Sequence, residues 1–310
     1  MRSGTRPVVR VLTGPTGSGK SDLAMALAER NGWEIVCMDS MQIYRRMDIG
    51  TAKPTAEDRK RVPHHLLDLC EPTETFSAAA WRDRAEALLR TMTAEGRVPL
   101  LTGGTGLYLR ALTHGMGMGG AEADPALRAE LRSMAETPGG KEKLHAMLET
   151  LDAATAERLP VNDVRRVIRA IEVTKATGIP FSRQPESEAP SPWDFRIAAL
   201  RWPREMLYDR INRRVDRMIR DGLAGEVEAL LREGVPEDAQ SMAGLGYKEM
   251  IPYLRGQATL AEAADRIRLG TRHYAKRQMT FLRREPLTVY VDLPDPAAEE
   301  KLMRFFEEES

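Results

Sequence analysis

Short apolar runs and longer amphipathic stretches alternate along most of the chain. Five apolar runs rich in β-branched residues predict strands, at Val8–Thr13, Glu34–Met38, Val98–Thr102, Phe195–Leu200 and Thr288–Asp292. Most of them are separated by stretches with helical periodicity, such as Phe76–Gly96. Because strands that alternate with helices form a parallel sheet covered by helices on both faces, we predict an α/β fold.

A segment in the middle of the chain lacks this alternation. Between Thr102 and Phe195 we predict no strand but four helices, at Pro125–Glu136, Gly140–Leu151, Asp152–Arg158 and Asp163–Thr177. A glycine-rich stretch precedes these helices, and a proline- and serine-rich stretch follows them. We therefore predict a small helical subdomain, residues 116–194, inserted into a core domain of residues 1–115 and 195–310.

The composition is that of an ordinary globular protein, since 42% of the 310 residues are hydrophobic. Two cysteines do not make a disulfide framework, and no apolar run is long enough to span a membrane. The first motif begins too near residue 1 to leave room for a cleaved signal. We therefore expect a cytoplasmic protein without membrane contact, and we expect a monomer.

The strongest motif is GPTGSGKS at residues 14–21, which matches the complete Walker A pattern between a predicted strand and a predicted helix. Its glycines allow backbone N–H groups to turn inward, and the start of the helix adds a positive field. Lys20 adds a point charge, and Ser21 adds a hydroxyl suited to Mg²⁺. The motif predicts a P-loop NTPase-like sheet and a phosphate site formed by Gly14, Pro15, Thr16, Gly17, Ser18, Gly19, Lys20 and Ser21.

Two further polar residues follow predicted strands. Asp39 follows the second strand, and Thr105 lies in the glycine-rich turn after the third. Because ligands of parallel sheets lie beyond the carboxyl ends of the strands, we expect both residues near the phosphate loop. Asp39 fits a turn or cap residue equally well, and the Thr105 turn alone is more typical of a simple connection. His64 and His65 lack metal-ligand spacing, which favours an ordinary loop pair over a metal site and leaves a phosphate or substrate contact open.

Charge is unevenly distributed, although the net charge of zero at first argues against a nucleic-acid partner. Residues 268–285 are strongly basic, and Arg268, Arg272 and Lys276 form a stripe at helical spacing. A second amphipathic helix, residues 162–178, carries arginines outside its apolar face. Each pattern alone is more typical of a solvated face, but the two together favour a shared polyanion.

Seven segments, taken in order, resemble the tRNA dimethylallyltransferases, which prenylate an adenine beside the anticodon. They are GPTGSGKS, DSMQIYRRMDIGTAKP, HHLLD, LTGGTGLYLRAL, NDVRRVIRAIEV, GLGYKEM and KRQMTFLRRE. The resemblance covers roughly Val8 to Leu293, and a generic kinase shares only the first segment. Without a C-terminal zinc-finger extension, the chain resembles the bacterial form.

The resemblance implies that the phosphate loop holds dimethylallyl diphosphate, whose diphosphate is the leaving group. The exocyclic amine of the adenine on the 3′ side of the anticodon then attacks the first carbon of the prenyl chain. Asp39 matches the family's general base, and Thr105 matches a residue at the reaction centre. Lys20, Mg²⁺ at Ser21, and one arginine of Tyr208–Met218 would neutralise the departing diphosphate; among these arginines we favour Arg210.

The resemblance also implies that the adenine swings out of the anticodon stem-loop to reach the site. The inserted subdomain would clasp the loop from one side, and the basic core helix would hold it from the other. The expected tRNA contacts are Asp39, Ser40, Met41, Gln42, Thr105, Arg128, Arg165, Arg166, Val167, Ile168, Arg169, Arg272, Lys276 and Arg277.

The chain departs from the family pattern at three positions. The family often has Ala at Gly17, Thr at Ser21 and Trp at Phe281. The first two changes keep the chemistry possible, whereas Phe281 lacks the indole N–H and its role stays open.

Two other functions are compatible with the phosphate loop. A P-loop small-molecule or nucleoside kinase explains the loop and the sheet but not two arginine-rich helices, and it predicts ATP consumption. No acidic residue ends the strand Val98–Thr102, which weakens an ATPase interpretation. A non-catalytic RNA-binding protein with a nucleotide switch predicts that Asp39→Ala leaves function intact.

Overall fold

The computed structural model describes residues 6–114, 124–184, 191–286 and 288–308. The chain divides into two compact units, one formed by Met1–Thr113 with Ser191–Ser310 and the other by His114–Pro190. These boundaries lie within a few residues of those expected from the sequence. The larger unit is an α/β domain, and the smaller one is helical.

A six-stranded sheet with the order β3-β2-β4-β1-β5-β6 forms the centre of the larger unit, and every pair of neighbouring strands is parallel. Its strands are β1 Val8–Thr13, β2 Glu34–Cys37, β3 His64–His65, β4 Pro99–Gly103, β5 Asp194–Arg201 and β6 Thr288–Asp292. The predicted α/β class and the five predicted strands are confirmed. The prediction of an ordinary loop at His64 and His65 was wrong, because these residues pair with Ile35 and Val36 as an edge strand too short to show alternation.

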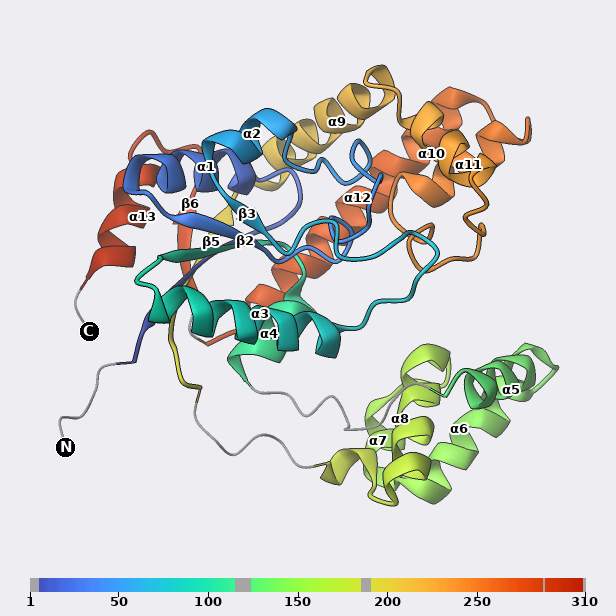
Figure 1. The fold of residues 1–310 in the computed structure, drawn as a ribbon. Coiled ribbons are helices and arrows are strands. Elements are labelled where there is room, and N and C mark those ends of the chain that lie inside the picture. Colours follow the sequence, from blue (N-terminus) through green and yellow to red (C-terminus); the bar gives the residue numbers. More distant parts are fainter. Residues whose placement is uncertain (1–5, 115–123, 185–190, 287, 309–310) are drawn as a thin grey trace, which may run out of the picture. The chain divides into compact units, whose positions relative to one another are not determined.

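Helices cover both faces of this sheet (Figure 1), with α1 and α13 on one side and α3 and α4 on the other. The helices of this unit are α1 Lys20–Asn31, α2 Ala56–Arg61, α3 Ala78–Ala94, α4 Gly106–Thr113, α9 Arg204–Arg220, α10 Leu223–Arg232, α11 Tyr247–Leu254, α12 Leu260–Leu282 and α13 Ala298–Glu307. In the described residues, no helix has the length and apolar character needed to cross a membrane.

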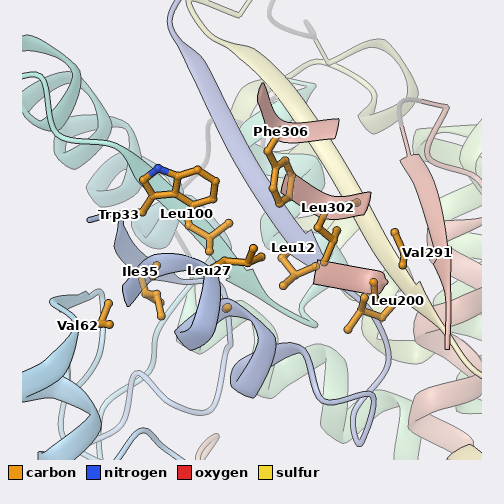
Figure 2. Packing of buried hydrophobic residues seen from close by; sticks show 14 residues of the cluster. Leu12, Leu27, Trp33, Ile35, Val62, Leu100, Leu200, Val291, Leu302 and Phe306 are labelled. Carbon is orange, nitrogen blue, oxygen red and sulfur yellow. The ribbon is translucent and has the colours of Figure 1, made fainter. Parts of the chain in front are cut away.

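The core between the sheet and α1 fixes the helix that follows the phosphate loop. Leu12 of β1, Leu27 of α1 and Leu200 of β5 are fully buried there, together with Phe306 of α13 (Figure 2). Burial of each such side chain contributes about 1.5–3 kcal/mol. The start of α1 is therefore held rigidly beside the carboxyl ends of the strands.

The helical unit has a core of its own. It contains α5 Pro125–Glu136, α6 Gly140–Leu151, α7 Ala153–Arg158, α8 Val164–Thr177 and a 3₁₀ turn at Phe181–Arg183. Leu131, Leu144, Leu148 and Ile171 fill its centre. The four helices predicted for this segment are confirmed, and Asp124, Asp152 and Asp163 cap α5, α7 and α8.

Candidate active site

The phosphate loop leaves β1 at Thr13 and enters α1 at Lys20. Gly17 and Gly19 have φ angles of 79° and 85°, which favour glycine. A Cβ at Gly19 would lie 2.9 Å from Nη2 of Arg210, because α9 packs directly on the loop. Among the described residues, no side chain caps the N-terminus of α1, so its first N–H groups can bind an anion.

A cleft of about 1050 Å³ adjoins this loop. Its walls come from the loop, from the segment after β2 and from α9. Its charged lining contains nine cationic and four acidic residues: Lys20, Arg45, Arg46, Lys53, Arg59, Arg210, Arg213, Arg214 and Arg217 against Asp22, Asp48, Asp68 and Asp221. The excess of positive charge suits a diphosphate.

Lys20 lies partly withdrawn from solvent at the start of α1. Burial, reinforced by the nearby Arg214 guanidinium, lowers the pKa of Lys20 to about 8, and the Asp39 carboxylate opposes this shift. The protonated form of Lys20 is therefore only weakly favoured near neutral pH until an anion binds beside it.

Two arginines of α9 have different roles. Nε of Arg210 donates to the carbonyl of Gly17 at 2.8 Å, and its guanidinium lies 4.6 Å from the Trp202 ring centroid. Arg214 is half-buried, donates to the carbonyl of Thr51 at 3.3 Å and interacts electrostatically with Lys20 and Asp39. Burial lowers the pKa of Arg214, but a guanidinium stays charged. Arg210 thus supports the loop backbone, whereas Arg214 belongs to the charged group around Lys20.

The structure brings Asp39 and Thr105 together at the ends of β2 and β4. Oδ1 of Asp39 accepts from the N–H of Met41 at 2.8 Å, which fixes the turn after β2. Oγ1 of Thr105 accepts from the N–H of Ser40 at 3.0 Å and donates to Oγ of Ser40 at 3.3 Å. The expected proximity of Asp39 and Thr105 follows from the parallel order of these strands.

Comparisons with known proteins agree on one family. A family model described as IPP transferase matches residues 42–285. The chain belongs to this family. The tRNA dimethylallyltransferase 1 of Trichlorobacter lovleyi is 46% identical over 94% of this chain and 96% of its own length. The tRNA dimethylallyltransferase of Halalkalibacterium halodurans is 43% identical over 94% of this chain and 93% of its own.

Solved structures of IPP transferases share the fold. The full-length tRNA isopentenylpyrophosphate transferase from Bacillus halodurans matches with a TM-score of 0.71 and 40% identity, over 97% of this chain and 95% of that one. A eukaryotic dimethylallyltransferase acting on tRNA matches with a TM-score of 0.77 and 25% identity, over 92% of this chain and 74% of that one. The family resemblance predicted from the seven segments is confirmed, and with it a transferase.

In this IPP transferase, Gln42 is engaged within the protein. Its side-chain oxygen accepts from Sγ of Cys37 at 3.2 Å, and its nitrogen donates to the carbonyls of Thr51 and Ala52 at 3.2 and 3.1 Å. Gln42 therefore links Cys37, the last residue of β2, to Thr51 and Ala52 farther along the chain.

Residues 47–54, which include Thr51 and Ala52, are also held by Glu226 and Lys53. Neither residue was identified from the sequence. The carboxylate of Glu226 on α10 accepts from the N–H groups of Asp48, Ile49 and Gly50 at 2.9, 2.7 and 3.1 Å, and from the hydroxyl of Tyr247 at 2.6 Å. Lys53, whose side chain is 1% exposed, pairs with Asp48 and Asp68. In the sequence, an acidic residue of an amphipathic helix that binds backbone N–H groups looks the same as one that is exposed to solvent.

The basic stripe of α12 does not form one continuous surface. Arg268 pairs with Asp216 of α9, and Nη2 of Arg272 donates to Asn212 at 2.7 Å. Lys276 and Arg277 are exposed. Of the three predicted contacts on this helix, Lys276 and Arg277 thus present their charges to solvent, with the Arg277 guanidinium 5.8 Å from the Tyr274 ring centroid. Arg272 is directed toward α9.

Phe281 lies where the family often has Trp. It is half-buried against Gly106 at the start of α4, where a Cβ would come within 2.5 Å of its ring. The Arg110 guanidinium lies 4.7 Å from the ring centroid. The aromatic face at this position therefore packs on the helix that follows Thr105.

Within the helical unit, the predicted tRNA contacts fall into three groups. Arg165 and Arg166 are exposed. Val167 and Ile168 are buried in the core of the unit, so their side chains do not form its surface. Arg128 and Arg169 bind the buried carboxylate of Glu172: burial alone would raise the pKa of Glu172, but these hydrogen bonds lower it below its usual value.

The cleft contains a hydroxyl suited to Mg²⁺, that of Ser21. Mg²⁺ is usually held by one or two protein oxygens together with phosphate oxygens and waters. The exposed side chain of Ser21 lines the cleft at the phosphate loop. Within the described residues, no group of three or more His, Cys, Asp or Glu side chains could hold a metal ion. Ser21 thus fits one ligand of a Mg²⁺ ion whose other ligands are phosphate oxygens and waters.

Proposed function

We propose that this protein transfers a dimethylallyl group from dimethylallyl diphosphate to the exocyclic amine of the adenine on the 3′ side of the anticodon of tRNA. The observation that carries the proposal is that a phosphate site and a pair of polar residues lie side by side at the carboxyl ends of the strands. A phosphate loop with Lys20 lies beside Asp39 and Thr105, and no acid of the Walker B type ends β4. The relatives named for this activity match nearly the whole chain.

On the donor side, the N–H groups at the start of α1, Lys20 and Arg214 bind the diphosphate. Negative charge grows on the diphosphate as its bond to the prenyl carbon breaks, and fixed positive groups stabilise that charge. Mg²⁺ held at Ser21 would add further positive charge. We assign the arginine of this group to Arg214, because its charge acts on Lys20 and Asp39. Arg214→Gln should weaken donor binding about 10–100-fold, the cost of a charged hydrogen bond. Arg220→Gln should not, because Arg220 is exposed at the end of α9 and does not line the cleft.

On the acceptor side, Asp39 takes the proton that the amine loses. The new N–C bond forms as the C–O bond of the donor breaks, the proton passes to Asp39, and diphosphate leaves. Thr105, hydrogen-bonded to Ser40, orients the acceptor beside this carboxylate. Ser40 and Met41 lie in the same turn, where they can contact the flipped base and its neighbours.

The anticodon stem-loop is the acceptor. The exposed cations Arg165, Arg166, Lys276 and Arg277 suit its phosphates. Arg128, Arg169 and Arg272 act mainly through the protein groups that they bind. The protein works as a monomer in the cytoplasm, where its two cysteines remain reduced thiols.

The direct test is incubation with labelled dimethylallyl diphosphate and an anticodon stem-loop, with ATP as a competing donor. The label should appear in the adenosine of the stem-loop without ATP consumption. Transfer of phosphoryl groups from ATP, with no prenylated product, would refute the proposal in favour of a kinase. No observation in the structure favours that alternative.

A further inference from the structure

Gln278 of α12 lies between two loops of the candidate active site. Its side chain is almost completely buried, with 7% exposed. The side-chain oxygen accepts from the N–H of Thr16 in the phosphate loop at 2.8 Å. The side-chain nitrogen donates to the carbonyl of Gly104, directly before Thr105, at 2.8 Å. A single carboxamide thus bridges the donor loop and the acceptor turn.

The approach of Gln278 to Gly104 depends on the missing side chain at residue 104. A Cβ there would lie 2.2 Å from the nitrogen of Gln278, and its next contacts would be at 3.4 Å. Any larger residue at this position would therefore displace the carboxamide. The close fit indicates a defined spacing between the loops and not an incidental contact.

Each of the two loops joined by Gln278 leads to a residue proposed to act in the reaction. The phosphate loop continues from Thr16 to Lys20, while Thr105 binds Ser40 next to Asp39. One turn before Gln278, Tyr274 interacts with both Thr105 and Gln278. The exposed residues Lys276 and Arg277 lie on the same helix, on the surface proposed for tRNA. Gln278 therefore connects the donor site, the acceptor site and the tRNA-facing helix.

We propose that Gln278 is a positioning residue, which sets the distance between the phosphate loop and the Thr105 turn. This inference rests on the proposed prenyl transfer. An attack on carbon requires the amine, the prenyl carbon and the leaving oxygen to be aligned, and a misplacement of about 1 Å can cost about 100-fold in rate. The phosphate loop joins β1 to α1 and the Thr105 turn joins β4 to α4. The Gln278 carboxamide fixes one of these loops relative to the other.

Two substitutions of Gln278 test its hydrogen bonds. Gln278→Met keeps the length of the side chain and removes both bonds. Gln278→Glu keeps an acceptor for Thr16 but places an oxygen against the carbonyl of Gly104. In single-turnover transfer to the stem-loop, both variants should react about 10–100-fold more slowly with full amplitude. Their dissociation constants for donor and stem-loop should stay within about threefold of wild type.

Gly104→Ala supplies an independent test, because it should displace the carboxamide without changing it. In the wild-type background it should slow transfer about as much as Gln278→Met. In a Gln278→Ala background it should cost much less, since the atom it would strike is gone. Fully additive effects of Gly104→Ala and Gln278→Ala would overturn the proposal.

Thr271→Val is the matched control for burial on the same helix. Thr271 is buried, and its hydroxyl donates to the carbonyl of Ile267 within α12. This variant should lower thermal stability and reactive amplitude at most, and leave the rate constant within about twofold. If Gln278→Met behaved in the same way, with reduced amplitude at an unchanged rate, its role would be purely structural. If wild-type protein transferred no prenyl group at all, the proposed function would fail first.

Discussion

At the scale of single residues, the charged group of Lys20, Arg214 and Asp39 dominates the candidate site. Lys20 is kept close to its titration point by burial, so a bound anion changes its protonation. Asp39 is held by its own turn at the end of β2. The charges of these residues interact, so a substitution that removes one charge should be detectable in the titration of Lys20.

We predict that donor binding takes up a proton near pH 8. In the free protein, burial lowers the pKa of Lys20 to about 8, so Lys20 loses its charge as the pH rises from 7 to 9. A diphosphate favours the charged form and raises this pKa again. Donor affinity should therefore fall as the pH rises through 8. Calorimetry in two buffers with different ionisation enthalpies measures the uptake, and the Lys20→Arg variant, always charged, should show none from this position. Equal uptake in both proteins would assign the proton to another group.

Asp39→Asn should lower the rate of prenyl transfer about 10²–10⁴-fold, the usual contribution of a general base. An asparagine oxygen can still accept from the N–H of Met41, so the turn should be kept. Donor affinity, measured by calorimetry, should change little. A variant that turned over at nearly the wild-type rate would remove Asp39 from the proton transfer.

Some of these residues could be identified from the sequence, and others could not. The phosphate loop has a fixed spacing, and Asp39 and Thr105 follow strands, so their placement follows from the fold class. From the sequence we favoured Arg210 for the diphosphate. Arg210 and Arg214 lie about one helical turn apart on α9, and helical periodicity does not distinguish their partners. Gln278 lies in the matched segment KRQMTFLRRE, but neither its bridging role nor that of Glu226 could be predicted, because their hydrogen bonds go to backbone groups far away in the chain.

At the scale of elements, the segment of residues 47–54 forms a wall of the cleft although it has no regular structure of its own. Its conformation is imposed by Gln42, Lys53 and Glu226. Strand positions were predictable because buried parallel strands are continuous apolar runs. The two-residue strand β3 and this segment were not, since long-range hydrogen bonds determine both.

Glu226→Ala should destabilise the protein by about 1–3 kcal/mol, because the N–H groups of Asp48, Ile49 and Gly50, the last two partly buried, lose their common acceptor. It should also weaken donor binding, since the cleft wall is no longer fixed. Urea unfolding and calorimetry measure the two effects. Glu228→Ala is the control: Glu228 is exposed on the same helix and pairs with Arg232, so its removal should change stability by less than about 0.5 kcal/mol. Equal effects of the two substitutions would contradict the role of Glu226.

At the scale of the whole molecule, a net charge of zero conceals segregated charge. The cleft lining and the exposed ends of α8 and α12 are basic, while none of the acidic residues of α13 lines the cleft. The division into two units was predictable from the break in alternation. The distribution of arginines between surface and buried ion pairs was not, because Glu172 binds two of them by tertiary contact.

The affinity for an anticodon stem-loop should fall steeply with salt. Arg165→Gln and Lys276→Gln should each reduce the slope of log affinity against log salt by about 1, as expected for one lost phosphate contact. Arg304→Gln on α13 removes an exposed charge outside the proposed tRNA surface and should leave the slope unchanged. Filter binding over a range of salt concentrations checks this. A salt-independent affinity would exclude both helices from the interface.

Which bond of the donor breaks can be measured with dimethylallyl diphosphate that carries ¹⁸O between the prenyl carbon and the first phosphorus. If the phosphate loop holds a leaving diphosphate, every turnover with the stem-loop releases ¹⁸O-labelled diphosphate and leaves unlabelled prenyl adenosine. Recovery of the ¹⁸O in a five-carbon alcohol would show that the phosphorus–oxygen bond breaks instead, and that the loop serves phosphoryl transfer.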